Sequence, residues 1–119
     1  MRKVLIVEDE EIIRRGLVDT IDWSGMGCVV VGDAADGRAG LEMIRSLHPD
    51  IVMTDIRMPR MDGIEMARAA RADGILGALV FFTSYSDFTY AREAIRLDAA
   101  DYLLKPVDER ELAKLMEKL

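Results

Sequence analysis

The amino-acid sequence predicts an α/β domain in which helices cover both faces of a parallel β-sheet. Short apolar runs alternate with helical patterns five times along the 119 residues. This alternation is typical of parallel strands linked by crossover helices. Half of the residues are hydrophobic, which argues against disorder. The length fits one domain, because a chain of this size buries roughly two-thirds of its unfolded surface.

Five strands are predicted from apolar runs, over residues 3–7, 28–31, 51–54, 79–82 and 101–104. Three consecutive valines in the second run indicate a strand that is buried on both faces. Because crossovers between parallel strands are right-handed, the leading topology is a flavodoxin-like, doubly wound sheet with strand order 2-1-3-4-5.

Five helices are predicted from apolar residues three and four positions apart, over residues 10–21, 36–47, 63–73, 87–97 and 108–119. The first of them has apolar residues close to helical spacing at Ile12, Ile13, Leu17 and Ile21. The last ends without a Gly or Pro terminator, which suggests that the chain is cut from something longer, although a true C-terminus at Leu119 also fits.

Composition excludes several classes of function. The net charge of −6 makes this chain a poor candidate for holding a nucleic-acid backbone. Its apolar runs are far shorter than the roughly 20 residues of a membrane span, and no signal peptide is recognisable. Cys28 is the single cysteine, so an internal disulfide is impossible, and a buried thiol is expected. These features predict a cytoplasmic protein without membrane contact.

Polar side chains stand where four of the predicted strands end, at Glu8, Asp9, Asp55, Thr83 and Lys105. Ligands of such sheets bind outside the carboxyl ends of the strands, where the strand order reverses. Three carboxylates, a hydroxyl and an ammonium should therefore converge from segments that are distant in the chain. A single acid after a strand is commonly a turn or cap residue, but that explanation is poor for the whole set.

Three crowded carboxylates repel one another, which raises a pKa or requires a cation. A hard divalent ion with oxygen ligands, Mg²⁺, fits this requirement, and Lys105 would add a second positive charge. With its charge compensated, a carboxylate can attack phosphorus. Phosphoryl transfer then needs mostly positioning and neutralisation of the phosphoryl oxygens, which the metal, Lys105 and the Thr83 hydroxyl can provide.

The sequence resembles the receiver domain family of two-component response regulators over its entire length. Four segments carry the resemblance, at residues 4–10, 49–59, 61–63 and 101–106, which read VLIVEDE, PDIVMTDIRMP, MDG and DYLLKP. The resemblance implies a domain that is phosphorylated by a sensor histidine kinase and that catalyses its own phosphorylation and slow dephosphorylation.

The resemblance also assigns roles to the acidic residues. Asp55 matches the phosphoacceptor. Asp9 matches a direct ligand of Mg²⁺, and Glu8 matches an acid that usually holds the metal through water. Arg57 matches the position whose backbone carbonyl binds the metal, so its side chain need not matter for binding.

Other matched positions concern the phosphoryl group and the response to it. Lys105 matches a lysine that contacts the phosphoryl group, and Pro106 a proline that is usually cis. Thr83 matches the switch hydroxyl and Tyr102 the switch aromatic. Ser84 departs from the small residue that many relatives have there, which leaves the phosphoryl lifetime open.

Finer features resemble receivers fused to AraC-type helix-turn-helix domains, at residues 21–23, 26–27, 83–88 and 90–91. For that subclass the resemblance implies DNA binding through the missing output domain and a homodimer that forms on phosphorylation. Trp23 is equally compatible with an ordinary aromatic at the edge of the core.

Three other functions are considered. A phosphatase of the haloacid dehalogenase type usually has a second Asp two residues after its nucleophile, where this chain has Arg57. A flavodoxin-like cofactor binder would need a phosphate-binding loop after the first strand, and no Ser/Thr/Gly-rich loop follows it. A receiver that cannot be phosphorylated is disfavoured because every site residue is present.

Overall fold

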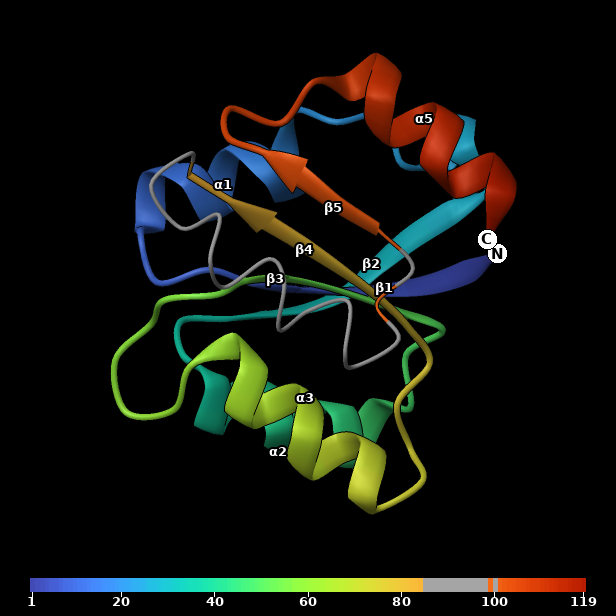
Figure 1. The fold of residues 1–119 in the computed structure, drawn as a ribbon. Coiled ribbons are helices and arrows are strands. Elements are labelled where there is room, and N and C mark those ends of the chain that lie inside the picture. The colour runs from blue at the N-terminus through green and yellow to red at the C-terminus, as the bar shows by residue number, and fades with distance from the viewer. Residues whose placement is uncertain (85–98, 100) are drawn as a thin grey trace.

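The structure is a computed structural model that describes residues 1–84, 99 and 101–119. A five-stranded parallel sheet runs through it in the order β2-β1-β3-β4-β5 (Figure 1), which confirms the predicted fold class. The strands are β1 (Arg2–Val7), β2 (Cys28–Ala34), β3 (Ile51–Asp55), β4 (Ala78–Thr83) and β5 (Asp101–Leu104). The chain leaves β1 for the β2 edge and then returns to β3, so the order reverses between β1 and β3.

The described helices cover both faces of the sheet. Helices α1 (Glu11–Asp19) and α5 (Glu109–Lys118) lie on one face, and α2 (Gly37–Leu47) and α3 (Gly63–Ala72) lie on the other (Figure 1). A short 3-10 helix, η1 (Ser24–Met26), precedes β2. The helix predicted over residues 87–97, and residues 85–88 and 90–91 of the subclass resemblance, lie outside the described residues.

Three of these helices begin at an aspartate that accepts a backbone N–H of the first turn. Asp36 caps α2, Asp62 forms a capping box with Glu65 at α3, and Asp108 caps α5. Helix α1 differs, because Glu10 at its N-cap makes no side-chain capping bond.

Two hydrophobic clusters fill the space between the sheet and the helices. Alternate residues of β1 point to opposite faces, so Leu5 and Val7 join the cluster under α2 and α3, while Val4 and Ile6 join the one under α1 and α5. Strands β1, β3 and β4 are therefore buried on both sides, as expected for the centre of a parallel sheet.

The sequence-based prediction for β2 was wrong. The three valines suggested burial on both faces, but β2 is an edge strand and Val29 is 41% exposed. Ile12 is also an exception to the helical pattern, since its side chain is 88% exposed while Leu17 is buried. Successive helical residues point about 100° apart, and in α1 it is Ile13, not Ile12, that packs against the cluster under α1 and α5.

The two ends of the chain lie side by side, at the end of the sheet where strand β1 begins (Figure 1). The Arg2 guanidinium donates to the carbonyls of Met116, at 2.8 Å, and Leu119, at 3.1 Å. Arg2 thus supplies donors to carbonyl groups in the last turn of α5, where carbonyls lack the usual partner four residues on, although the Met116 carbonyl also accepts the Leu119 N–H at 3.4 Å. None of the helices in the described part of the chain has the length and apolar character needed to span a bilayer.

Candidate functional site

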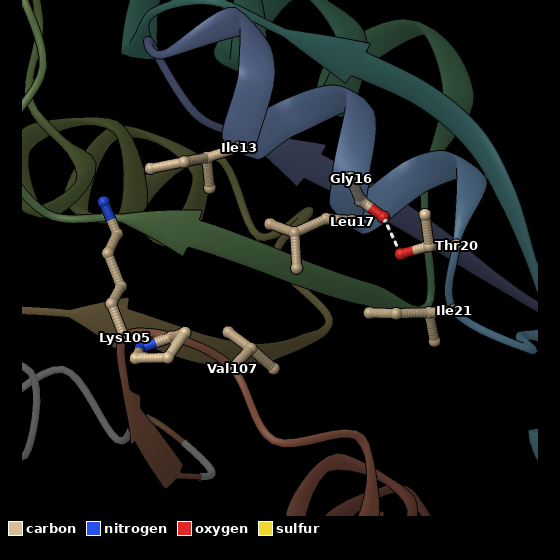
Figure 2. A pocket seen from close by; sticks show the side chains of 8 residues that line it. Ile13, Gly16, Leu17, Thr20, Ile21, Lys105 and Val107 are labelled. Carbon is tan, nitrogen blue, oxygen red and sulfur yellow. Dashed lines mark hydrogen bonds between the residues drawn. The ribbon is translucent and has the colours of Figure 1, made fainter.

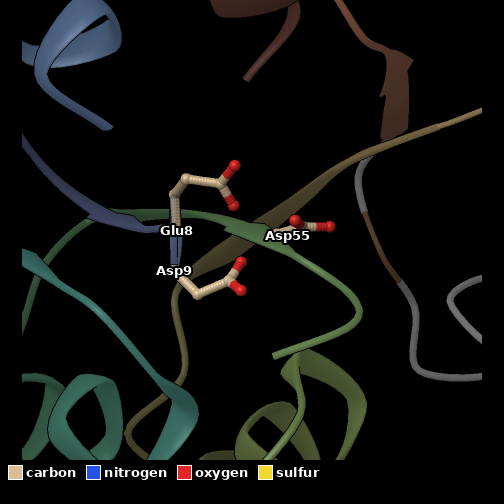
Figure 3. A group of neighbouring side chains, drawn as sticks. All are labelled: Glu8, Asp9 and Asp55. Carbon is tan, nitrogen blue, oxygen red and sulfur yellow. The ribbon is translucent and has the colours of Figure 1, made fainter. Parts of the chain in front are cut away.

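The carboxyl ends of β1 and β3 bring three acidic side chains together. Glu8, Asp9 and Asp55 each offer an oxygen, and these oxygens all lie within 4.8 Å of one another (Figure 3). Glu8 is fully buried and Asp55 is 5% exposed, whereas Asp9 is open to solvent. The Oε2 atom of Glu8 is buried and accepts no hydrogen bond from the described residues. An all-oxygen donor set with such an oxygen fits a hard divalent cation such as Mg²⁺.

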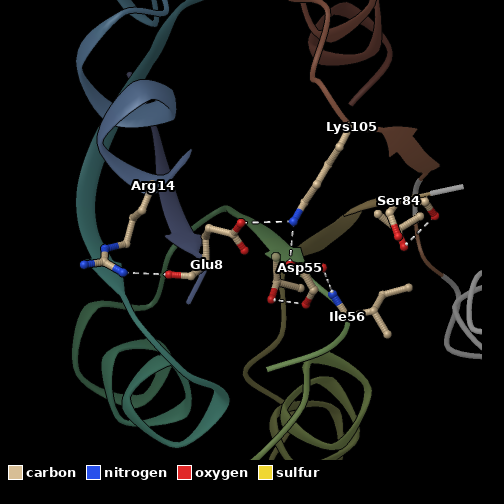
Figure 4. Close-up of polar contacts among 8 residues, drawn as sticks. Glu8, Arg14, Asp55, Ile56, Ser84 and Lys105 are labelled. Atoms are coloured by element: carbon tan, nitrogen blue, oxygen red, sulfur yellow. Dashed lines mark hydrogen bonds and ion pairs between the residues drawn. The ribbon is translucent and has the colours of Figure 1, made fainter. Parts of the chain in front are cut away.

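Lys105 enters this acidic cluster from the end of β5. Its Nζ atom donates to Glu8 Oε1 at 3.0 Å and to Asp55 Oδ2 at 2.7 Å (Figure 4). The ammonium also lies 5.6 Å from the centre of the Phe82 ring. The Lys105–Pro106 peptide bond is cis, as the family resemblance implied. One cation thus partly compensates two buried carboxylates and leaves Glu8 Oε2 available.

Burial and charge shift the protonation of this group. Burial, together with the neighbouring Asp55, raises the pKa of Glu8 to about 8, against the opposing effect of Lys105. Burial alone would lower the pKa of Lys105, but its bonds to Asp55 and Glu8 outweigh that effect and the pKa is raised. At neutral pH a charged Lys105 and a protonated Glu8 are therefore favoured.

The backbone around Asp55 is held by the start of α3. The N–H of Ile56 donates to Asp55 Oδ1 at 2.7 Å, and the N–H of Gly63 donates to the Ile56 carbonyl at 2.7 Å. A Cβ atom on Gly63 would collide with the carbonyl oxygen of Asp55. The segment Met61-Asp62-Gly63 thus ends in a glycine where helix and strand backbones meet. The Ile56 N–H fixes one carboxylate oxygen of Asp55, and the other oxygen faces Lys105.

The other residues predicted for the site lie around the acidic cluster. Thr83 is buried at the end of β4, and its hydroxyl donates to the Ser84 carbonyl at 3.3 Å. Its own carbonyl accepts the N–H of Lys105 at 2.8 Å, so the two segments are adjacent. Tyr102 packs against the cluster under α2 and α3. Arg57 follows β3 with an exposed side chain.

Sequence reasoning missed one basic residue next to the acids. Arg14, in α1, donates to the backbone carbonyl of Glu8 (Figure 4) and to the carboxylate of Asp33 on β2. The sequence gives little sign of this contact, since an arginine on a helix surface is usually solvated. Only its position six residues after Glu8 could have suggested that it reaches back over the loop.

An apolar pocket of about 390 Å³ lies beside Lys105 (Figure 2). One wall comes from α1 and the residues that follow it, and the other from the segment after β5. The lining residues are Ile13, Gly16, Leu17, Thr20, Ile21, Lys105, Pro106 and Val107. The pocket therefore adjoins the acidic cluster and shares Lys105 with it.

Comparisons with known proteins identify the family. The chain matches the response regulator receiver domain over residues 4–117. It is 34% identical over 119 residues to the uncharacterized transcriptional regulatory protein YesN of Bacillus subtilis, and 38% identical over 120 residues to the transcriptional regulatory protein HptR of Staphylococcus aureus. The chain spans 32% of the length of YesN and 46% of HptR.

Solved structures agree with this assignment. The REC domain of AraT, a response regulator from Geobacillus stearothermophilus, superposes with a TM-score of 0.87 at 43% identity, covering 98% of this chain and 94% of that one. The receiver domain of a putative response regulator NarL from Mycobacterium tuberculosis has a TM-score of 0.87 at 32% identity, covering 98% and 94%. The chain therefore belongs to the receiver domains of response regulators, the phosphorylation-controlled signalling domains of two-component systems.

Proposed function

We propose that Asp55 accepts a phosphoryl group from a phosphohistidine of a sensor histidine kinase, with Mg²⁺ as the required cofactor. The observation that carries this proposal is the position of Asp55, a nearly buried carboxylate that faces Lys105 at 2.7 Å and shares its surroundings with two further acids. Glu8, Asp9, Asp55 and the backbone carbonyl of Arg57 would hold the metal. Bound Mg²⁺ supplies positive charge that offsets the carboxylates and the phosphoryl oxygens.

In the transfer, an Asp55 carboxylate oxygen attacks phosphorus while the donor's nitrogen–phosphorus bond breaks. The imidazole leaves with the electron pair of that bond and takes up a proton, and Asp55 becomes an acyl phosphate. Lys105 then moves its hydrogen bond from the carboxylate to a phosphoryl oxygen. The Thr83 hydroxyl donates to another oxygen, so the domain catalyses its own phosphorylation and its slow hydrolysis.

The same groups give a switch. Thr83 ends β4 beside β3, and Tyr102 lies on β5 opposite Phe81 of β4. Movement of the Thr83 hydroxyl towards the phosphoryl group opens space into which Tyr102 turns. The phosphoryl group stabilises this second state only by the difference between its affinities for the two states.

The apolar pocket beside Lys105 supports a docking place for the phosphodonor. A helix of the kinase that packs its apolar side against Ile13, Leu17 and Pro106 would bring a histidine on its neighbouring turn towards Asp55. The pocket is lined by both α1 and the segment after β5, so docking there needs the folded domain.

The relatives that are named transcriptional regulatory proteins are two to three times longer than this chain. We propose that the chain is the regulatory domain of a cytoplasmic transcription regulator with an AraC-type DNA-binding domain, and that phosphorylation favours a homodimer. Its net charge of −6 agrees with DNA contact through another domain.

Incubation of the chain with acetyl phosphate and Mg²⁺ should add one phosphoryl group per molecule, because the two buried carboxylates that Lys105 contacts share one site and only Asp55 keeps some exposure to solvent. Intact-mass spectrometry measures the addition, and excess EDTA should suppress it. A receiver stops at one phosphoryl group per chain, so fast steady turnover of phosphate esters would support a phosphatase instead. Undiminished labelling in EDTA would contradict the role of the metal.

The affinity for Mg²⁺ should increase with pH, because a proton and the cation compete for the same carboxylate. Since the pKa of Glu8 is raised to about 8, the proton is favoured below that value and lost above it. For a single group this predicts an affinity that is about tenfold higher at about pH 9 than at about pH 7. Calorimetric titrations measure the affinity. The Glu8→Gln variant is the control, and its weaker affinity should vary little over this range.

A further inference from the structure

The guanidinium of Arg14 links the loop that carries the acids to the neighbouring strand. Its Nη1 atom donates to the backbone carbonyl of Glu8 at 2.8 Å, and its Nε atom donates to Asp33 Oδ2 on β2 at 3.0 Å. The side chain is 15% exposed, so these bonds lie largely out of water. Figure 4 shows the guanidinium beside the Glu8 backbone, on the side away from Lys105.

The loop from Glu8 to Glu10 has few other supports among the described contacts. Strand β1 ends at Val7, and the Glu8 N–H makes one more bond to the Ala34 carbonyl, at 2.9 Å. Glu10 provides no side-chain cap for α1. The Glu8 backbone is therefore fixed at its N–H by β2 and at its carbonyl by Arg14, which is itself anchored on β2.

We propose that Arg14 is a positioning residue that, anchored on Asp33, holds Glu8 and Asp9 in the orientation needed to bind a divalent cation. This inference rests on the proposed metal-dependent function. A planar guanidinium can donate to two acceptors in fixed directions, whereas a lysine ammonium is a compact charge on a flexible chain. Geometry, and not charge alone, should therefore decide whether the acids are correctly placed.

The Arg14→Lys variant tests this distinction because it keeps the charge and removes the planar fork. Calorimetry with MgCl₂ should give a dissociation constant about tenfold higher than that of the parent, the size of effect seen when groups supporting metal ligands are removed. Arg15→Lys is the matched control. Arg15 lies on the same helix and pairs with the same Asp33 oxygen, and its described hydrogen bond goes to Asp33 alone. Its affinity should stay within about twofold of the parent value.

A second readout separates positioning from a general loss of structure. At saturating Mg²⁺ the Arg14→Lys variant should be phosphorylated by acetyl phosphate at nearly the parent rate, since excess metal restores occupancy of a correctly folded site. In EDTA, amide exchange at Glu8 and Asp9 should be faster than in the parent, with exchange in β3 unchanged. If Arg14→Lys does not fold, Asp33→Asn replaces it, because that variant removes the charge that anchors the guanidinium and leaves Arg14 in place.

The outcomes are distinguishable. A parent protein that binds no Mg²⁺ would overturn the proposed function itself. If the parent binds Mg²⁺ but Arg14→Lys shows unchanged Mg²⁺ affinity and unchanged amide exchange, only the role of Arg14 is overturned. The same conclusion applies to Asp33→Asn where that variant is used instead. Equal losses of Mg²⁺ affinity in Arg14→Lys and Arg15→Lys would also reject the positioning role of Arg14. The effect would then come from the loss of any arginine that pairs with Asp33.

Discussion

The Asp55→Asn variant is expected to take up no phosphoryl group from acetyl phosphate, whereas the parent takes up one. The amide keeps the shape of the side chain but lacks the carboxylate oxygen that attacks phosphorus. Loss of a nucleophile should lower the rate by at least about a thousandfold. Glu8 cannot substitute for it, because its carboxylate is fully buried behind Lys105.

Intact-mass spectrometry over time measures this difference. Asp73→Asn is a suitable control, because Asp73 is an acid on the surface that pairs with Arg45 away from the site. That variant should be labelled at the parent rate. Equal labelling of Asp55→Asn and the parent would mean that another residue is the acceptor.

The Gly63→Ala variant should lose about 3 kcal/mol of unfolding free energy, because the added methyl group would collide with the Asp55 carbonyl oxygen. The backbone at the start of α3 cannot move away from the backbone of Asp55 and Ile56 easily, since the Gly63 N–H also donates to the Ile56 carbonyl at 2.7 Å. For a domain of this size the loss corresponds to a fall in the melting temperature of roughly 10–20 °C. The displaced Asp55 backbone should also slow phosphorylation at a temperature where the variant is still folded.

Urea denaturation followed by circular dichroism measures the loss of unfolding free energy. Gly16→Ala is the matched control, because Gly16 lies within α1 and no heavy atom lies within 4 Å of its added Cβ. That variant should gain roughly 0.5–1 kcal/mol, since Ala is the better helix former. A Gly63→Ala variant as stable as the parent would show that α3 can shift away from β3 without cost.

Much of the fold could be predicted because strands and helices leave different periodic patterns in a sequence. The alternation of elements indicated a parallel sheet with crossover helices, and the helices predicted over residues 36–47 and 108–119 begin at the aspartates that cap them in the structure. The valines of β2 misled because burial of a strand depends on its place in the sheet. An edge strand and a central strand can have the same local composition.

The strand-end residues could be predicted for a similar reason, since parallel strands end at one edge of their sheet. Their meeting explains why Glu8, Asp55 and Lys105 are in contact although they are far apart in the chain. The part played by Arg14 could not be predicted, because it depends on where a long side chain turns after α1 has packed on the sheet. Likewise, the close approach of Gly63 to Asp55 exists only once α3 meets β3.

The hydrogen bonds between Arg2 and the end of α5 have a consequence for protein engineering. Because the two ends lie within reach of one side chain, a short glycine-rich linker could join them, and new ends could be opened at the exposed turn around Gly74. The domain could equally be inserted into a surface loop of an unrelated host protein through two adjacent attachment points. In both designs the acidic edge of the sheet faces away from the junction, which suits the domain to serve as a phosphorylation-responsive sensor module.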